Sequence, residues 1–309
     1  MTAAGTETVR TAEIALRGPY DLAEIAMMGF GHRNESSFDG VMRLAFCVDG
    51  HARDGWKQQV GVELRQSGDH LGLVVQGDGD LDAITAQVAR VVSADADGAA
   101  WDAICVSDPV LAPVHAVAPG FRPSNFYSPY EAAVWSVISA RRARPQGIAL
   151  RRRIAEAHGR VFTLAGRAEA AIPTPSRLLT ITDFPGLPAD RIPRLHAIAN
   201  AALDGQLDVD RLRAMEPEAA MLDLQQLPGI GPFYSALIVI RALGLTDVLS
   251  TQEDHTRDAV RQWCGLDHVP DDVELAAIAE AWRPFRTWAA VTLRALSSRA
   301  PSSRTPQGA

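Results

Sequence analysis

The feature that most constrains the fold of this chain is a change of sequence pattern near Pro123. Before that residue, short stretches alternate between apolar and polar residues with a period of two, which is typical of half-buried strands. The clearest of these stretches are RLAFCV (43–48), QVGVELR (59–65) and HLGLVV (70–75). DLDAITAQVARVVS (80–93) instead places its apolar residues at helical spacing. We therefore expect a small α+β N-terminal domain with an antiparallel sheet.

After Pro123 the patterns are helical. PYEAAVWSVISARR (129–142) follows Ser128, a good N-cap residue, and has a proline at the first helical position. Apolar stripes with helical spacing recur at 192–202 and 275–285. These patterns predict a domain that consists mostly of helices.

The patterns divide the chain into four expected segments. They are a flexible N-terminus (1–18), an α+β domain (19–122), a helical domain (123–296) and a disordered tail rich in serine and proline (297–309). A length of 309 residues is enough for two domains with cores of their own.

Composition limits the classes of protein to which the chain can belong. No run of 18 apolar residues occurs, so the sequence predicts no membrane span. The N-terminus lacks the basic start and apolar stretch of a secretory signal. The three cysteines, Cys47, Cys105 and Cys264, are far apart and odd in number, which argues against a disulfide framework, a zinc site or an iron–sulfur cluster. We therefore expect a protein of the reducing cytoplasm.

The formal charge of −7 is unevenly distributed along the chain. Residues 1–125 carry 9 basic and 17 acidic side chains, whereas the remainder carries 21 and 20. RRARPQGIALRRRIAEAHGR (141–160) contains seven arginines and one acid. Such a cluster is either a patch that faces phosphates or a solvated basic helix face. Arg151 and Arg152 are our candidates for phosphate contacts within it.

A tight glycine turn, LPGIG, separates two helical stretches, LDLQQ and PFYSALIVIRAL. We expect Gly229 and Gly231 to supply positive φ and to let another backbone approach closely. Exposed N–H groups in such a turn, with the positive end of the next helix behind them, form an anion site, and a DNA phosphate suits it. Leu227, Gly229, Ile230 and Gly231 are therefore candidate DNA contacts. The alternative is an ordinary connection between helices.

An ordered series of stretches resembles the helix-hairpin-helix DNA glycosylase superfamily, and more specifically its 3-methyladenine DNA glycosylase II branch. The series runs from about Tyr20 to about Leu296 and comprises YDLAEIAMMGFGHRNE, FYSPYEAAVWSVISARR, PTPSRLLTI, RLHAIANAALDGQL, LPGIG and WRPFRTWAA. The resemblance implies an α+β N-terminal domain and two helical lobes that flank a cleft.

The resemblance also implies a reaction. Such enzymes extrude a damaged base from double-stranded DNA and enclose it in a pocket, where aromatic faces attract a positively charged alkylated purine. A carboxylate then stabilises the positive charge on the sugar as the N-glycosidic bond breaks. No redox cofactor or catalytic metal is implied, only a structural monovalent cation bound by the backbone carbonyls of Gln225, Leu227 and Gly229. We expect a monomer in the cytoplasm, associated with the nucleoid if the source is bacterial.

The implied base pocket departs from the family pattern. Phe233, Tyr234 and Trp288 are candidate pocket residues, with plain core residues as the alternative. Leu237, also a candidate, replaces a tyrosine of the family, and Arg294 replaces a tryptophan. Phe233 also stands where bifunctional members carry their Schiff-base lysine, so the resemblance implies a monofunctional enzyme.

Two other positions carry expected roles. Spacing from the hairpin places Glu253, followed by Asp254, where the family has its catalytic aspartate. A glutamate has one more methylene, and a displacement of about 1 Å can cost about a hundredfold in rate. The alternative is that these acids, with Thr251, only cap the following helix. Arg141 stands at the wedge position, where an arginine can fill the gap that the extruded base leaves.

Three functions remain open on the sequence. The leading one is a monofunctional alkylation-repair glycosylase that leaves an abasic site. The second is a DNA-binding relative with weakened or lost catalysis that recognises damaged or distorted DNA, which the altered carboxylate and pocket favour. The third is a helical scaffold for protein partners.

The two adjacent acids generate a prediction that separates catalysis from capping. If Glu253 faces the sugar, Glu253→Gln abolishes base release and spares DNA affinity, because its charge matters mainly as positive charge develops. Asp254→Asn should instead lower the free energy of unfolding by about 0.5–1 kcal/mol, since Asp254 then completes the helix cap. Base-release assays and thermal unfolding of both variants check this. An inactive Asp254→Asn beside an active Glu253→Gln would show that the register is off by one.

Overall fold

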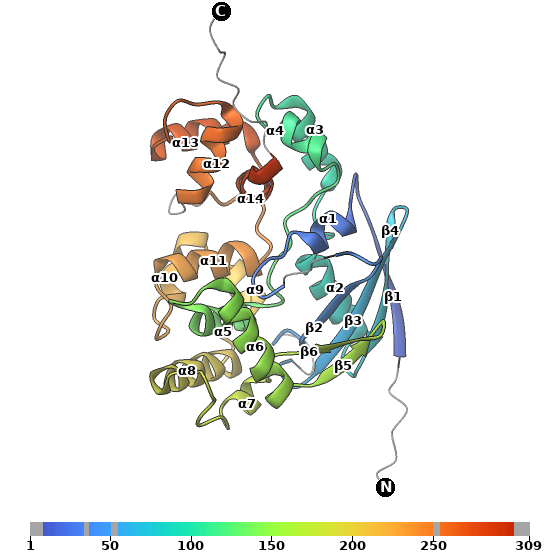
Figure 1. Ribbon diagram of the computed structural model, residues 1–309, viewed down its shortest axis with the longest axis vertical. Helices are drawn as coiled ribbons and strands as arrows, with labels where there is room; N and C mark the ends of the chain where they lie inside the picture. Colours follow the sequence, from blue (N-terminus) through green and yellow to red (C-terminus); the bar gives the residue numbers. More distant parts are fainter. Residues whose placement is uncertain (1–8, 34–36, 51–54, 250–253, 300–309) are drawn as a thin grey trace, which may run out of the picture.

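The computed structural model of the protein describes residues 9–33, 37–50, 55–249 and 254–299. Figure 1 shows a twisted sheet on one side of the molecule and two groups of helices on the other. The α+β class predicted from the sequence is confirmed. Within the described ranges, no helix combines the length and the apolar character that crossing a membrane requires.

The sheet of the N-terminal part is antiparallel and four-stranded. Its spatial order is β1 (Val9–Ala15), β4 (His70–Gln76), β3 (Gln59–Ser67) and β2 (Met42–Cys47). Helices α1 (Leu22–Met27) and α2 (Leu81–Val91) share its apolar core. The three strands predicted from alternation are confirmed. β1 lies in the segment expected to be flexible, which corrects that expectation: it is an edge strand in which only Ile14 is buried, so it carries little apolar pattern.

The first group of helices, which we call the hairpin lobe, runs from α5 to α11. Its helices are α5 (Pro129–Ser139), α6 (Arg144–His158), α7 (Pro175–Leu178), α8 (Ile192–Leu203), α9 (Val209–Arg213), α10 (Pro217–Leu224) and α11 (Pro232–Ala242), with a 3-10 turn, η1 (Ala189–Arg191). The hydroxyl of Ser128 accepts a hydrogen bond from the Glu131 N–H, which confirms the predicted cap of α5. Helix α5 is buried over residues 129–138 and packs against α6, α8 and α11, so it is the central helix of this lobe.

A short hairpin interrupts the helical domain that the sequence predicts. Strands β5 (Val161–Leu164) and β6 (Arg167–Ala170) pair with each other and lie beside the main sheet, where Phe162 and Leu164 contact Ala45 of β2 (Figure 1). Four-residue strands are too short to show a clear period, which explains why the pattern did not predict them.

The second group, which we call the terminal lobe, joins segments that are far apart in the sequence. It contains α3 (Gly98–Ser107), α4 (Leu111–Val117), α12 (Asp254–Cys264), α13 (Asp272–Ala279) and α14 (Arg286–Ala295), with the 3-10 turns η2 (Glu280–Trp282) and η3 (Ser297–Arg299). Trp101 of α3 packs edge to face on Trp288 of α14, with ring centroids 5.8 Å apart. Residues 98–117 therefore belong with the C-terminal helices and not with the sheet, which corrects the domain boundary expected near residue 122.

A buried ion pair joins the sheet to the hairpin lobe. The Glu131 carboxylate of α5 accepts hydrogen bonds from the Cys47 N–H of β2 at 3.1 Å and from the Arg151 guanidinium of α6 at 3.3 Å. Arg151 also donates to the carbonyl of Ala170 and is only 9% exposed. Its expected role as a phosphate contact is therefore wrong, because its charge is used inside the protein.

This buried pair predicts a pH dependence of stability. Burial raises the pKa of Glu131 from 4.5 to about 7, although the Arg151 charge lowers it. The folded state thus holds this proton to higher pH than the unfolded state, so stability should fall as the pH rises from about 4.5 to about 7.

Glu131→Gln should remove that slope, because the amide does not titrate, even if it lowers stability at every pH. Glu156→Gln, which alters an exposed carboxylate of α6, is the control and should keep the slope. Denaturant unfolding across this pH range measures both, and an equal slope in Glu131→Gln and the unchanged protein would contradict the account.

Candidate active site

The predicted glycine turn connects α10 to α11. The Ile230 N–H donates to the Leu227 carbonyl at 3.0 Å, and the buried Ile230 side chain anchors the turn in the core of the hairpin lobe. Gly229 adopts φ +94°, as predicted. Gly231 has φ −94°, so the expectation of positive φ is wrong at that position.

Gly231 leaves open space in front of helix α11. A Cβ atom built there would meet no described atom within 4 Å, so neither packing nor backbone conformation requires a glycine. Gly231 also caps α11 without a side-chain hydrogen bond. The first N–H groups of the helix are therefore available to an anion that approaches the turn.

The turn also presents the carbonyl oxygens that the resemblance assigns to a cation. Within the described part of the chain, the Leu227 carbonyl accepts one backbone hydrogen bond, and those of Gln225 and Gly229 accept none. Gln225 is the C-cap of α10, where helix carbonyls lack intrahelical partners and the helix dipole is negative. These oxygens fit a hard cation chemically.

A cleft of about 690 Å³ opens where the two lobes meet the loop before residue 32. It is lined by Met28, Gly29, Phe30, Gly31, Phe126, Trp135, Ser139, Arg142, Arg144, Phe233, Tyr234, Leu237, His255, Arg294 and Ala295. Three predicted pocket residues of α11, Phe233, Tyr234 and Leu237, are thus brought together. The Phe233 side chain is 50% exposed, which favours a binding role over a plain core role.

The loop over residues 28–31 forms one wall of the cleft, and the sequence did not single it out as a pocket. Phe30 packs on Phe126 with ring centroids 4.7 Å apart. Gly31 has φ +61°, and a Cβ there would stand 2.6 Å from the Phe126 ring, so this position requires glycine. Arg144 donates to the carbonyls of Gly29, Gly31 and Arg33 and holds the loop in place. The glycines on both sides of Phe30 could have indicated this tightly turned loop in the sequence.

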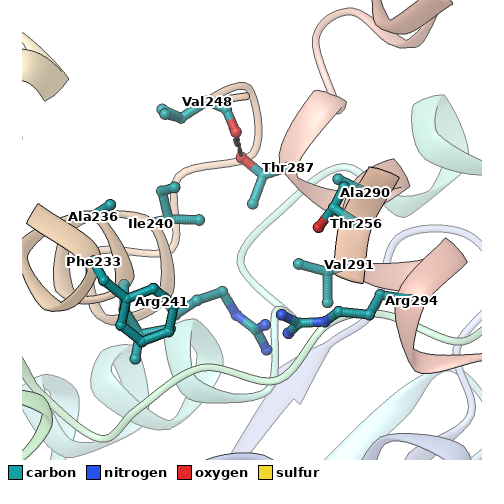
Figure 2. A pocket seen from close by; sticks show the side chains of 11 residues that line it. Phe233, Ala236, Ile240, Arg241, Val248, Thr256, Thr287, Ala290, Val291 and Arg294 are labelled. Carbon is teal, nitrogen blue, oxygen red and sulfur yellow. Dashed lines mark hydrogen bonds between the residues drawn. The ribbon is translucent and has the colours of Figure 1, made fainter. Parts of the chain in front are cut away.

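A smaller recess of about 40 Å³ adjoins the cleft, and Figure 2 shows the side chains that line it. Its walls come from α11, α12, α14 and Val248, and it shares Phe233, Leu237 and Arg294 with the cleft. The Thr287 hydroxyl and the Val248 backbone exchange hydrogen bonds of 2.8 Å, which fixes the chain just before the start of α12. Figure 2 shows the guanidinium groups of Arg241 and Arg294 pointing toward each other at one end of the recess.

Trp288 is not part of the cleft. Its side chain is 3% exposed and packs against Trp101 and Phe285 in the terminal lobe. The expectation of a pocket role is wrong, and the core role that the sequence left open is correct.

The structure places the remaining candidates at the surface or outside its described part. Arg141 is exposed and has φ +56°, and Arg152 has a side chain that is 72% exposed. Glu253 lies outside the described residues, and Asp254 is the first residue of α12. Its neighbour His255 lines the cleft, so α12 begins beside the cleft.

Comparisons with known proteins identify the fold. No protein-family model matches the chain. A curated relative, the probable bifunctional transcriptional activator/DNA repair enzyme AlkA of Mycobacterium tuberculosis, is 27% identical over 297 residues, which are 93% of this chain and 56% of the relative. The chain therefore spans about half the length of this relative.

Solved structures also match nearly the whole chain. The 3-methyladenine DNA glycosylase of Archaeoglobus fulgidus has a TM-score of 0.72 and 18% identity, with 93% of this chain and 98% of that chain covered. The structure of MBOgg1 in complex with a low-affinity DNA ligand has a TM-score of 0.66 and 16% identity, with 96% and 99% covered. The chain therefore has the helix-hairpin-helix DNA glycosylase fold that the sequence resemblance implied.

Proposed function

We propose that the protein is a DNA glycosylase that removes a damaged base from duplex DNA and leaves an abasic site. The observation that carries this proposal is that helix α11 begins at the turn and also lines the cleft. Gly231 opens the N-terminus of α11 to an anion, and Phe233 and Tyr234, which follow at once, line the cleft. A phosphate at the turn would hold a neighbouring nucleotide in front of these rings. The similarity of the chain to a DNA repair enzyme in sequence and to DNA glycosylases in structure supports the proposal.

The cleft suits an extruded base. Its volume of about 690 Å³ lies within the range of small-molecule sites, and aromatic side chains on opposite walls can stack on a planar ring. Arg141 is held in the left-handed region, which is uncommon for a residue with a side chain and recurs at functional sites. This supports Arg141 as the side chain that fills the gap in the base stack.

The proposed reaction is hydrolysis at the sugar carbon. The N-glycosidic bond breaks with its electron pair moving to the base, a water oxygen bonds to the sugar carbon, and the proton of that water goes to the departing base. A carboxylate at the start of α12, which we assign to Glu253 or Asp254, would stabilise the positive charge on the sugar. The start of α12 lies beside the cleft, which is where such a charge must act.

We also propose that the turn binds a structural monovalent cation through the carbonyls of Gln225, Leu227 and Gly229. The cation would offset the negative end of α10 and leave the N–H groups of the turn directed at the phosphate. It takes no part in the reaction.

The proposed phosphate site predicts the effect of side chains at the turn. Gly231→Leu should weaken binding to all duplexes evenly without lowering the melting temperature, because the added side chain fills only the space that the phosphate needs. Gly231→Ala should have a smaller effect. Arg152→Ala should reduce the slope of log affinity against log salt concentration by about one, which corresponds to the loss of one phosphate contact.

Arg65→Ala is the matched control for the second variant, because this exposed arginine lies on the acidic sheet domain. Fluorescence anisotropy at several salt concentrations measures the affinities. Unchanged affinity in Gly231→Leu and Arg152→Ala would contradict this placement of the DNA surface.

The proposal predicts base release without cleavage of the strand. Lys57 is the only lysine of the chain, and Phe233 stands at the family's Schiff-base position. Incubation with duplexes that each carry one damaged base should release free base, and strand breaks should arise only after heating in alkali. Borohydride should trap no covalent adduct with abasic DNA.

An adduct trapped through Lys57 would refute the monofunctional assignment. Damage-selective binding without base release from any duplex would favour the DNA-binding relative with lost catalysis.

A further inference from the structure

Arg241 places a buried positive charge at the end of the recess to which Arg294 also extends. Its side chain belongs to α11 and is only 2% exposed. One terminal nitrogen, Nη2, donates to the Ser124 carbonyl, and the guanidinium lies 3.7 Å from the centre of the Phe30 ring. The other two nitrogens, Nε and Nη1, have no hydrogen-bond partner within the described part of the chain. Buried guanidinium N–H groups without an acceptor are costly, so they call for one.

Arg294 adds a second positive charge at the same place. It extends from α14 toward Arg241, as Figure 2 shows, and lines both the recess and the cleft. Burial lowers the pKa of both guanidinium groups, and the Arg294 charge lowers the pKa of Arg241 further. The described residues that line the recess include no acidic side chain.

The rest of the recess is apolar. Leu237, Ile240 and Val291 are among its lining residues. With a volume of about 40 Å³ it cannot hold a whole base, so a base in the cleft would extend only its edge toward the arginines. A base with a carbonyl oxygen at that edge supplies the acceptor that Arg241 lacks. A base with a positive charge would instead be repelled by the buried Arg241 guanidinium in surroundings of low dielectric constant.

We propose that Arg241 and Arg294 make this pocket select a neutral or anionic damaged base that presents a carbonyl oxygen, in place of the cationic alkylated purine that the sequence resemblance implies. The inference rests on the proposed function, because it names the lesion class for the same cleft. Arg294 is then the specificity-determining residue, since it replaces an aromatic residue that would attract a cation. Arg241 also joins α11 to Ser124 and Phe30, so it has a structural role as well.

The test uses duplexes that differ in a single base. 8-Oxoguanine and hypoxanthine are neutral and carry a carbonyl oxygen, 7-methylguanine carries a carbonyl oxygen but is cationic in DNA, and ethenoadenine is neutral without a carbonyl. Equilibrium binding and the single-turnover rate of base release are measured for each and for undamaged DNA. The unchanged protein should favour the first two bases over the other two by about tenfold or more in affinity, in rate or in both. Ethenoadenine lacks the acceptor for a charged donor, and 7-methylguanine brings a positive charge close to Arg241.

The variants alter Arg294 and leave the Arg241 contacts in place. Arg294→Gln should reduce the preference for the neutral carbonyl bases over the cationic 7-methylguanine by about tenfold. Arg294→Trp should shift the preference toward 7-methylguanine. Arg261→Gln removes an exposed charge of α12 outside the pocket and should leave the preference unchanged. Thermal unfolding of each variant verifies that it is folded.

The outcomes separate this inference from the proposed function. Base release that favours 7-methylguanine, or a preference that Arg294→Gln leaves unchanged, overturns the inference while the glycosylase function stands. Binding that Arg294→Gln weakens equally for damaged and undamaged duplexes shows a phosphate contact and also overturns it. Selective binding of carbonyl bases without base release supports the inference and refutes the glycosylase function. The absence of both selectivity and release refutes the inference and the glycosylase function together.

Discussion

The buried Arg241 guanidinium fixes the geometry on which the cleft depends. Its hydrogen bond to the Ser124 carbonyl and its stacking on Phe30 tie α11 to the segment that leaves the sheet domain and to the loop that walls the cleft. A second hydrogen bond joins the same parts, because the Phe126 N–H donates to the Arg241 carbonyl at 2.7 Å. A charge that is removed from water remains stable only where such partners surround it, so each of these parts constrains the others.

Helix α11 consequently holds the two proposed binding positions, the turn and the cleft wall, at a fixed distance. Its N-terminus faces solvent behind Gly231, and the next two turns present aromatic, then apolar, then charged side chains to the cleft and the recess. The apolar cores of the hairpin lobe and the terminal lobe hold the helices on both sides of this cleft. A phosphate bound at the turn and a base bound in the pocket would therefore be positioned by one rigid element, which is what precise chemistry requires.

The sequence predicted the parts that local pattern controls. Strands β2, β3 and β4 and helices α5 and α11 follow from alternation, capping and apolar spacing. Local pattern could not predict that two adjacent arginines have different environments. Arg152 is exposed, whereas Arg151 is paired with Glu131, a residue 20 positions earlier. Trp288 is a core residue because Trp101 of α3, 187 positions earlier in the chain, packs on it. Arg241 could have been singled out from the sequence as a candidate site residue, because it is the one charged residue in the apolar stretch ALIVIRAL. The roles of Glu253 and Asp254 still rest on the sequence alone.

The most direct test of the account is a crystal structure of the protein bound to duplex DNA that carries a lesion analogue resistant to hydrolysis. The account predicts a phosphate within hydrogen-bond distance of the N–H groups that follow Gly229, and an extruded nucleotide whose base lies between Phe233 and Phe30. DNA bound on another face of the molecule, or a base that stays stacked in the duplex with an empty cleft, would contradict it.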